Sequence, residues 1–209
     1  ILDDRGGTAF QQASAQLRRA RRNQQLGNLD LSRQAFERAA ELFGQAGDLR
    51  EVAIARGGVA DILRDRGRLD EALRIRREEE LPVYERLGDV RSTAITQGRI
   101  ADILQDRGQL DEALRIQIEE QLPVYERLGD VRSKAVTQGR IADILQARGQ
   151  LDDALRIRIE EQLPVFERLG DVVMNHLVTT EIEEMPETVR QHAEVLRGRS
   201  MLVRRTEVF

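Results

Sequence analysis

Residues 88–128 read GDVRSTAITQGRIADILQDRGQLDEALRIQIEEQLPVYERL, and residues 129–169 repeat this stretch with only 6 differences. Residues 47–87 align with both copies without a gap, so the same unit of 41 residues occurs three times in succession. A repeat of this length is typical of stacked architectures, in which each unit buries its apolar face against its neighbours. The sequence therefore predicts a repeat protein rather than a globule with one central core.

The composition favours helices. Charged residues make up 33% of the 209 residues, hydrophobic residues 40% and aromatic residues only 3%, and there is no tryptophan. Helix formers are abundant, whereas the aromatic and β-branched residues that strands prefer are few. We expect an all-α protein.

The first half of each repeat has the pattern of a helix. In the middle copy, apolar residues recur at helical spacing from Val90 to Leu104. Asp89 is suited to cap the start, because its carboxylate can accept hydrogen bonds from first-turn amides. Gly108 has the backbone freedom that ends a helix. A first helix is thus predicted from about Val90 to Arg107.

The second half predicts a helix from about Asp111 to Leu128, antiparallel to the first. Stacking such pairs at a constant offset gives a right-handed superhelical α-solenoid of antiparallel helix pairs. Proline removes a backbone hydrogen bond and clashes with the preceding turn, so we expect a kink, or a helix that stops near Gln121 and a short separate turn. The prolines lie at the same place in the three copies: Pro82, Pro123 and Pro164.

We expect a single array over residues 1–209 that extends beyond the close copies 47–87, 88–128 and 129–169. Residues 8–46 form a diverged repeat in which Gly27 matches the turn glycine. Residues 170–209 form diverged helices, a cap or a junction, with a last helix opened by Pro186 and running toward Arg205. Terminal repeats usually expose polar faces, but several residues here are apolar and suit a dimer or another domain: Val172, Val173, Met174, Val203, Val208 and Phe209.

One string in the repeat carries a family resemblance: Ile100-Ala101-x-x-Leu104-x-x-x-Gly108-x-Leu110-x-x-Ala113-Leu114. It resembles the consensus of tetratricopeptide repeats, which are helix pairs that bind proteins and peptides. Two consensus aromatic positions are occupied instead by Gln97 and Gln117, and the period exceeds the usual length of about 34 residues. Longer repeats of this kind resemble those of kinesin light chains and of bacterial signalling proteins.

Charge and composition argue against several classes of function. The net charge is −4, and no block of the chain is basic enough to favour nucleic-acid binding. The chain has no cysteine, and no apolar stretch has the length of a membrane span. We expect a cytoplasmic protein that binds neither nucleic acid nor membrane. Because the chain begins at Ile1, we also expect a fragment of a longer protein.

No pattern for catalysis stands out. His176 and His192 are sixteen residues apart and lack the spacing of paired metal ligands on one helix. The serines have no neighbouring histidine, and Gly57-Gly58 is not followed by the lysine of a phosphate-binding loop. We expect no enzymatic activity, no cofactor and no metal, and surface positions for both histidines.

The resemblance places the first helix of each pair on the concave side of the array. The partner-binding residues that it implies are Arg21, Gln24 and Gln25 in the N-terminal repeat, Ile54, Gly57, Asp61, Arg64 and Asp65 in the second, Ile95, Gly98, Asp102, Gln105 and Asp106 in the third, and Val136, Gly139, Asp143 and Gln146 in the fourth.

Two features of this face have alternative interpretations. The repeated glycine, as in Gly57, admits either a ligand or a closely packed helix. The row of carboxylates represented by Asp61 could attract a cationic or amide-rich segment, or could be solvated and paired with Arg64 on its own helix. Because Asp and Gln replace the Lys, Asn and Arg of clamps for acidic chaperone tails, such a clamp is not expected.

The sequence thus predicts a non-catalytic protein–protein interaction scaffold that binds a peptide or helix of a partner in its concave groove. The alternative is a regulatory or sensor segment of a larger multidomain signalling protein or enzyme. Self-association through the C-terminal helices is compatible with both. The sequence does not identify the partner.

Overall fold

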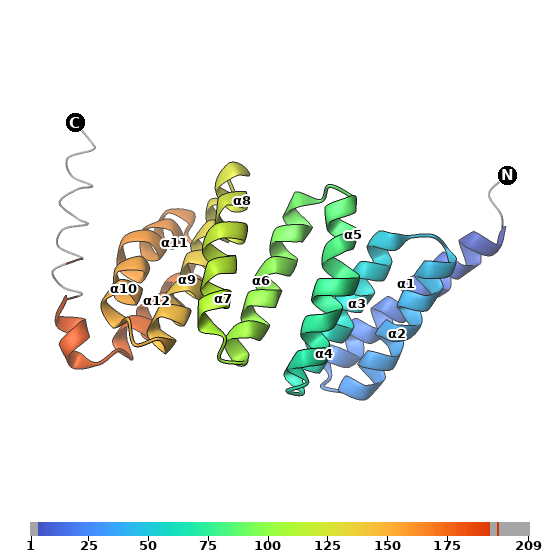
Figure 1. Ribbon diagram of the computed structural model, residues 1–209, viewed down its shortest axis with the longest axis horizontal. Coiled ribbons are helices and arrows are strands. Elements are labelled where there is room, and N and C mark those ends of the chain that lie inside the picture. Colours follow the sequence, from blue (N-terminus) through green and yellow to red (C-terminus); the bar gives the residue numbers. More distant parts are fainter. Residues whose placement is uncertain (1–3, 193–195, 197–209) are drawn as a thin grey trace. The chain divides into compact units, whose positions relative to one another are not determined.

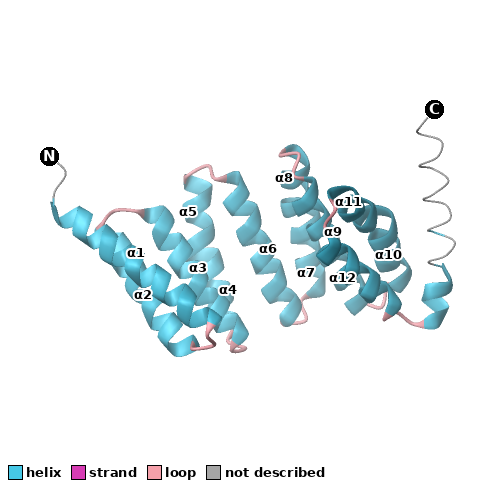
Figure 2. Cartoon of the chain, turned by 180° about the vertical axis from the view of Figure 1, so that it is seen from behind, coloured by secondary structure: helices cyan, strands magenta, loops and turns pink. Residues whose placement is uncertain are grey.

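The computed structural model describes residues 4–192 and residue 196 (Figure 1). All regular elements in this part of the chain are helical, as the composition predicts (Figure 2). The chain divides into two compact units, Ile1–Gly108 and Gln109–Phe209. None of the helices in the described part is long and apolar enough to cross a membrane.

The first unit is a stack of antiparallel helices. Its elements are α1 (Asp4–Gln25), α2 (Leu29–Gln45), α3 (Leu49–Asp65), α4 (Leu69–Arg74), η1 (Ile75–Glu80), α5 (Leu81–Arg86) and α6 (Val90–Asp106). Helix α1 packs along α2, and α2 packs along α3. The continuous helical path α4–η1–α5 packs along α3 on one side and contacts α6, the last helix of the unit, on the other.

The second unit repeats this pattern. Its elements are α7 (Leu110–Arg115), η2 (Ile116–Gln121), α8 (Leu122–Arg127), α9 (Val131–Ala147), α10 (Leu151–Arg156), η3 (Ile157–Gln162), α11 (Leu163–Leu169) and α12 (Val172–Glu183). A further helical stretch, residues 187–192, follows Pro186 directly, close to the predicted opening of the last helix. The predicted continuation toward Arg205, with Val203, Val208 and Phe209, lies outside the described residues.

The predicted boundaries of the first helices are confirmed. The carboxylate of Asp89 accepts a hydrogen bond from the Ser92 amide at 3.0 Å, and Asp130 accepts one from Ser133 at the same distance. After α6, Gly108 has φ of 74°, in the left-handed region where a side chain would be strained. Aspartate at the start and glycine at the end therefore delimit these helices as the repeat pattern predicts.

The α-helix predicted across Ile116–Gln121 is wrong, because these residues form the π-helix η2. The amide of Leu122 donates to the carbonyl of Gln117, five residues back, and Pro123 is the second residue of the α-helix that follows. Widening the turn lets the helical path accept a residue that has no N–H and that clashes with the carbonyl four residues earlier. The same solution occurs in all three copies, at η1, η2 and η3.

The core of each unit is built from alanine and aliphatic side chains. In the second unit, Leu155 and Phe166 of the α10–α11 path are fully buried, together with Ala142 of α9. In the first unit, Phe36 and Phe43 of α2 are buried, and the ring of Phe43 meets Phe10 of α1 edge to face, with centroids 5.5 Å apart. Small residues between large ones allow neighbouring helices to approach closely.

Candidate functional site

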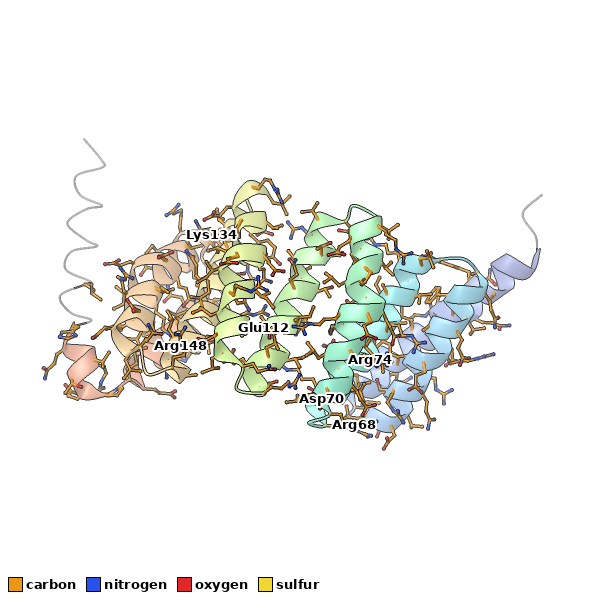
Figure 3. All side chains as sticks on the ribbon, viewed as in Figure 1. Arg68, Asp70, Arg74, Glu112, Lys134 and Arg148 are labelled. Atoms are coloured by element: carbon orange, nitrogen blue, oxygen red, sulfur yellow. The ribbon has the colours of Figure 1, made fainter. Side chains whose placement is uncertain are left out.

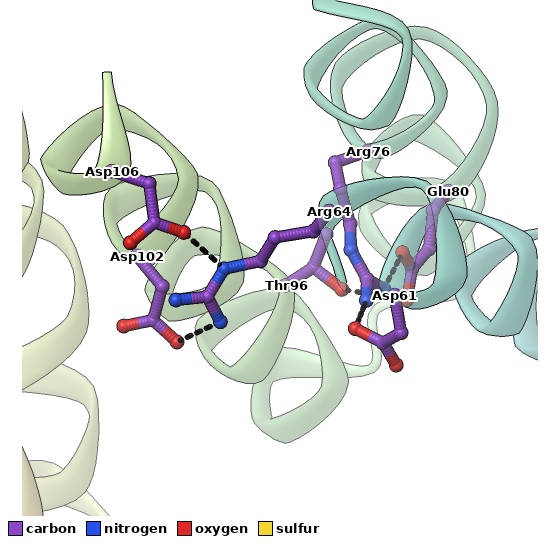
Figure 4. A network of polar contacts seen from close by, with 7 residues as sticks. All are labelled: Asp61, Arg64, Arg76, Glu80, Thr96, Asp102 and Asp106. Atoms are coloured by element: carbon purple, nitrogen blue, oxygen red, sulfur yellow. Dashed lines mark hydrogen bonds and ion pairs between the residues drawn. The ribbon is translucent and has the colours of Figure 1, made fainter. Parts of the chain in front are cut away.

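Polar contacts in the first unit join α3, η1 and α6 (Figure 4). Arg64 at the end of α3 reaches across to α6, where its Nε lies 2.5 Å from Oδ2 of Asp106 and its Nη1 lies 3.8 Å from Oδ2 of Asp102. The hydrogen bond to Asp106 raises the pKa of Arg64. Arg64 therefore links two consecutive first helices and does not pair with Asp61 of its own helix, the pairing considered from sequence.

Asp61 pairs instead with Arg76 of η1. The Arg76 side chain is only 5% exposed and also binds Glu80, whose other oxygen accepts a hydrogen bond from Thr96 of α6 at 3.2 Å. Burial raises the pKa of the Glu80 carboxyl, although Arg76 and Thr96 act in the opposite direction. One buried guanidinium thus neutralises part of the predicted carboxylate row.

The second unit contains a related arrangement. Arg158 of η3, with 2% of its side chain exposed, binds Asp143 of α9 at 2.6 Å and Glu181 of α12 at 3.0 Å. Burial raises the pKa of Asp143, while the charge of Arg158 lowers it. The repeated aspartate therefore has the same kind of partner in two repeats, an arginine fifteen residues later in the chain.

Gly57 and Gly139 serve close packing, which is one of the two interpretations that the sequence left open. A Cβ atom on Gly57 would lie 2.7 Å from Nη1 of Arg76 and 2.9 Å from Oε1 of Glu80. A Cβ atom on Gly139 would clash with Nε2 of Gln162, which hydrogen-bonds the nearby Ala135 carbonyl at 3.1 Å. These glycines make room for buried polar side chains of the second helix.

The exposure of the predicted partner-binding residues falls into three groups. The exposed ones are Arg21, Gln25, Asp65, Ile95, Asp106 and Gln146. The half-buried ones are Gln24, Ile54, Asp61, Arg64, Asp102, Gln105, Val136 and Asp143. The buried ones are Gly57, Gly98 and Gly139. Within the first unit the structure brings together Asp61, Arg64, Asp102 and Asp106, and the buried glycines are not available to a partner.

Sequence reasoning missed the buried arginines. Arg76 and Arg158 occupy the same repeat position as Gln117, where the repeat consensus has an aromatic residue. A charged residue at an apolar position, with an aspartate fifteen residues earlier in both repeats, was the signal that could have identified these pairs. The middle copy has Gln117 at this position, so the pattern is not uniform.

Two hollows lie in the second unit. One, of about 460 Å³, is bounded by α11 and α12 and lined by Phe166, Asp171, Asn175 and His176, among others. The other, of about 360 Å³, includes His192, whose Nδ1 lies 3.0 Å from Asp152. Within the described part of the chain, no three His, Asp or Glu side chains are placed to hold a metal ion.

Several solved structures share this arrangement of helix pairs. A protein of Podosopora anserina, described as a kinesin light chain with nearly identical TPR-like repeats, is 16% identical and aligns with a TM-score of 0.59 over 82% of this chain and 97% of its own. A single-residue variant of it is 14% identical, with a TM-score of 0.61 over 93% and 99%. The chain has a tetratricopeptide-like fold.

A third structure of this fold is BtubC (BKLC) from P. vanneervenii, 15% identical, with a TM-score of 0.55 over 95% of this chain and 92% of its own. At such identities the likeness establishes the tetratricopeptide-like α-solenoid fold and nothing finer. No protein-family profile matches the sequence.

One curated protein shares a short stretch with this chain. It is the phosphoribosylaminoimidazole-succinocarboxamide synthase of Pelobacter propionicus, 52% identical over 33 residues. The match covers 16% of this chain and 11% of the synthase. So short a segment does not carry the activity of the synthase to a chain whose described residues form helical repeats.

Proposed function

We propose that this chain is a non-catalytic scaffold that binds a peptide or helix of a partner protein along the exposed side of its first helices. The observation that carries the proposal is the surface shared by α3 and α6 in the first unit. There Ile95 is an apolar side chain with 45% of its surface exposed, and Asp65 and Asp106 are exposed carboxylates. An exposed apolar residue on helices that also carry exposed acids supplies both contact area and charge for a partner.

The charge of this surface supports a cationic or amide-rich partner segment. Arg64 is shared by Asp102 and Asp106, and Asp65 forms no ion pair with any described residue. Among the residues drawn in Figure 4, the carboxylates of Asp61, Glu80, Asp102 and Asp106 outnumber the guanidiniums of Arg64 and Arg76. A surplus of negative charge attracts basic segments and accelerates their association at low salt.

The test is the binding of a lysine-containing helical peptide, followed by fluorescence anisotropy. Asp65→Lys should weaken binding several-fold, and Ile95→Ser should weaken it without changing the salt dependence. Glu85→Lys is the matched control, because Glu85 is an exposed acid on α5 and also has no ion pair with a described residue. Equal effects of Asp65→Lys and Glu85→Lys would show that the peptide responds to net charge alone, and would refute binding at this surface.

A second candidate function is a regulatory or sensor segment of a larger protein, and α12 favours it. Val172 is 78% exposed, Val173 76% and Leu177 47%, so one side of this helix is apolar and accessible. Such a patch suits contact with another domain or with a second copy of the chain. Sedimentation over a range of concentrations would distinguish self-association from contact with another domain, since only self-association depends on the concentration of this chain alone.

A further inference from the structure

The exposed side of α1 is basic and amide-rich from Phe10 onward. Between Ala9 and Leu29 the sequence contains four arginines and no acidic residue. The arginines lie close together in the second half of the helix and all are exposed: Arg18, Arg19, Arg21 and Arg22. The glutamines Gln11, Gln12 and Gln25 are exposed on the same helix.

None of these four arginines forms an ion pair or side-chain hydrogen bond with a described residue. Several other arginines of the first unit form ion pairs, among them Arg68 and Arg74, which Figure 3 labels. Arg68 binds Glu71 at 2.5 Å, Arg74 binds Glu79 at 2.8 Å, and Arg107 binds Asp70 of the preceding repeat at 2.9 Å. The α1 arginines are therefore a cluster of cations that no described residue compensates, in a chain whose net charge is −4.

The spacing of the exposed residues is that of a helix-contact line. Five of them follow one another at intervals of four, three, four and three residues: Gln11, Ala15, Arg18, Arg22 and Gln25. Residues at this spacing form one stripe along a helix, the arrangement through which two helices pack side by side. Ala15 is small and leaves space for a side chain of an adjacent helix. The opposite side of α1, with the buried residues Ala13, Leu17 and Ala20, packs on α2.

The chain itself shows which chemistry such arginines bind. Neighbouring repeats are joined by arginine–carboxylate pairs between helices, as between Arg66 and Asp30 at 2.6 Å and between Arg148 and Asp111 at 3.3 Å. Figure 1 shows α1 at one end of its unit, and α1 packs on α2 through its buried side. A helix on the outer side that carried carboxylates at matching spacing would complete the same type of contact.

We propose that the stripe Gln11–Ala15–Arg18–Arg22–Gln25 on α1 is a docking surface for an acidic helix of a partner protein. This surface lies on α1 and is basic, whereas the Asp65–Ile95 surface lies on α3 and α6 and is acidic, so the two would bind different segments. An acidic helix is favoured over nucleic acid or an anionic membrane, because the chain as a whole is negatively charged and would repel an extended polyanion beyond the α1 patch.

The test uses the full chain and an alanine-based helical peptide with glutamates at three- and four-residue spacing. The same peptide with glutamine in place of glutamate is the control ligand. The glutamate peptide should bind and the glutamine peptide should not, and binding should weaken as salt is raised toward roughly 0.5 M. Replacing both Arg18→Ala and Arg22→Ala should weaken binding by about tenfold.

The matched variant is Arg127→Ala with Arg168→Ala. Both are exposed arginines in the last turns of α8 and α11, and neither has an ion pair with a described residue. This variant removes the same charge elsewhere and should leave the affinity unchanged. Asp65→Lys should likewise not weaken binding of the acidic peptide, which separates this test from that of the proposed function.

Three results would overturn the proposal. The first is equal binding of the glutamate and glutamine peptides. The second is equal weakening by the α1 variant and by the Arg127 and Arg168 variant. The third is that single-stranded DNA, or phosphatidylglycerol vesicles, bind more tightly than the acidic peptide and that this binding also depends on Arg18 and Arg22. Such a result would assign the patch to nucleic acid or to an anionic membrane, respectively.

Discussion

Arg64 of α3 donates a hydrogen bond from Nε to Oδ2 of Asp106 on α6 over 2.5 Å, so that the first helices of two consecutive repeats are joined by an ion pair. The pair is partly exposed, with 30% of the Arg64 side chain and 39% of the Asp106 side chain accessible. We expect a double-mutant cycle with Arg64→Ala and Asp106→Ala to give a coupling energy of about 0.5 to 1 kcal/mol at low salt. Denaturant unfolding measures this energy, and a coupling that does not decrease with salt would contradict the assignment.

The buried Arg158 should contribute more to the free energy of unfolding than the partly exposed Arg64. Removing one partner of a fully buried ion pair costs about 3 to 5 kcal/mol, but Asp143 retains 44% side-chain exposure, so we expect Arg158→Ala to lower the free energy of unfolding by about 2 kcal/mol. Arg156→Ala is the control, because Arg156 is 59% exposed and pairs with Asp153 at 3.3 Å. Its loss should cost below about 0.5 kcal/mol. Similar losses in both variants would show that burial of Arg158 is unimportant.

The phenol of Tyr84 should ionise at a higher pH than that of an exposed tyrosine. Burial raises the pKa of its phenol from 10.0 to about 12, and the charge of Glu80 adds to this effect. In a Tyr125→Phe variant, which introduces the residue that the third copy has as Phe166, Tyr84 is the sole tyrosine and the chain has no tryptophan. The absorbance of tyrosinate near 295 nm then reports on Tyr84 alone.

The sign of the accompanying stability change follows from the raised pKa. The unfolded chain loses the phenol proton near pH 10, whereas the folded chain keeps it until about pH 12. The free energy of unfolding should therefore fall as pH rises through this interval, because the unfolded state then binds fewer protons than the folded state. Tyrosinate formation at pH 10 in a chain that retains its helical circular dichroism would contradict the burial of Tyr84.

Substitution by alanine should change the stability of the fold in opposite directions at two helical glycines. A Cβ atom on Gly58 would lie 2.5 Å from the ring of Phe36, whereas the nearest atom to one on Gly44 is Cγ2 of Val52 at 4.0 Å. We expect Gly58→Ala to destabilise the fold by about 1 to 3 kcal/mol through overpacking. Gly44→Ala should stabilise it by about 0.5 kcal/mol through helix propensity. Thermal unfolding of both variants checks this, and stabilisation by Gly58→Ala would contradict the close contact with Phe36.

Replacing the repeated proline should change stability only slightly. In the interior of an α-helix, removal of proline would stabilise by about 3 kcal/mol. Pro123 instead follows the π-helix as the second residue of α8, where a missing amide costs little. Pro123→Ala should therefore shift the free energy of unfolding by less than about 1 kcal/mol. A gain near the interior value would indicate an ordinary α-helix across this segment.

Much of the fold could be predicted from local sequence, because local chemistry determines it. The 41-residue period, the aspartate before α6 and the glycine after it identify helix pairs and most of their boundaries. Pro123 indicated an irregularity in the second helix of the repeat. The form of this irregularity could not be deduced, because a kink, a break and a widened turn each accommodate a residue without an amide hydrogen.

The candidate surface was predicted less completely. The repeated position of Asp61 on the first helix was readable from the alignment of the copies, and so was the glycine at Gly57. In the structure, Asp61 binds Arg76, and Gly57 makes room for the same guanidinium. Both contacts depend on how the two helices pack. Side chains fifteen residues apart are brought together by the turn between their helices, which periodicity alone does not describe.

By itself, then, the sequence determined the class of architecture, the length of the unit and the start and end of each first helix, because these follow from hydrophobic spacing, capping and backbone freedom within a few residues. Tertiary structure alone decided which charges remain available to a partner. Arg64, Arg76 and Arg158 compensate carboxylates of neighbouring helices, whereas Arg18 and Arg22 pair with no described residue, and this difference arises only when the helices are packed.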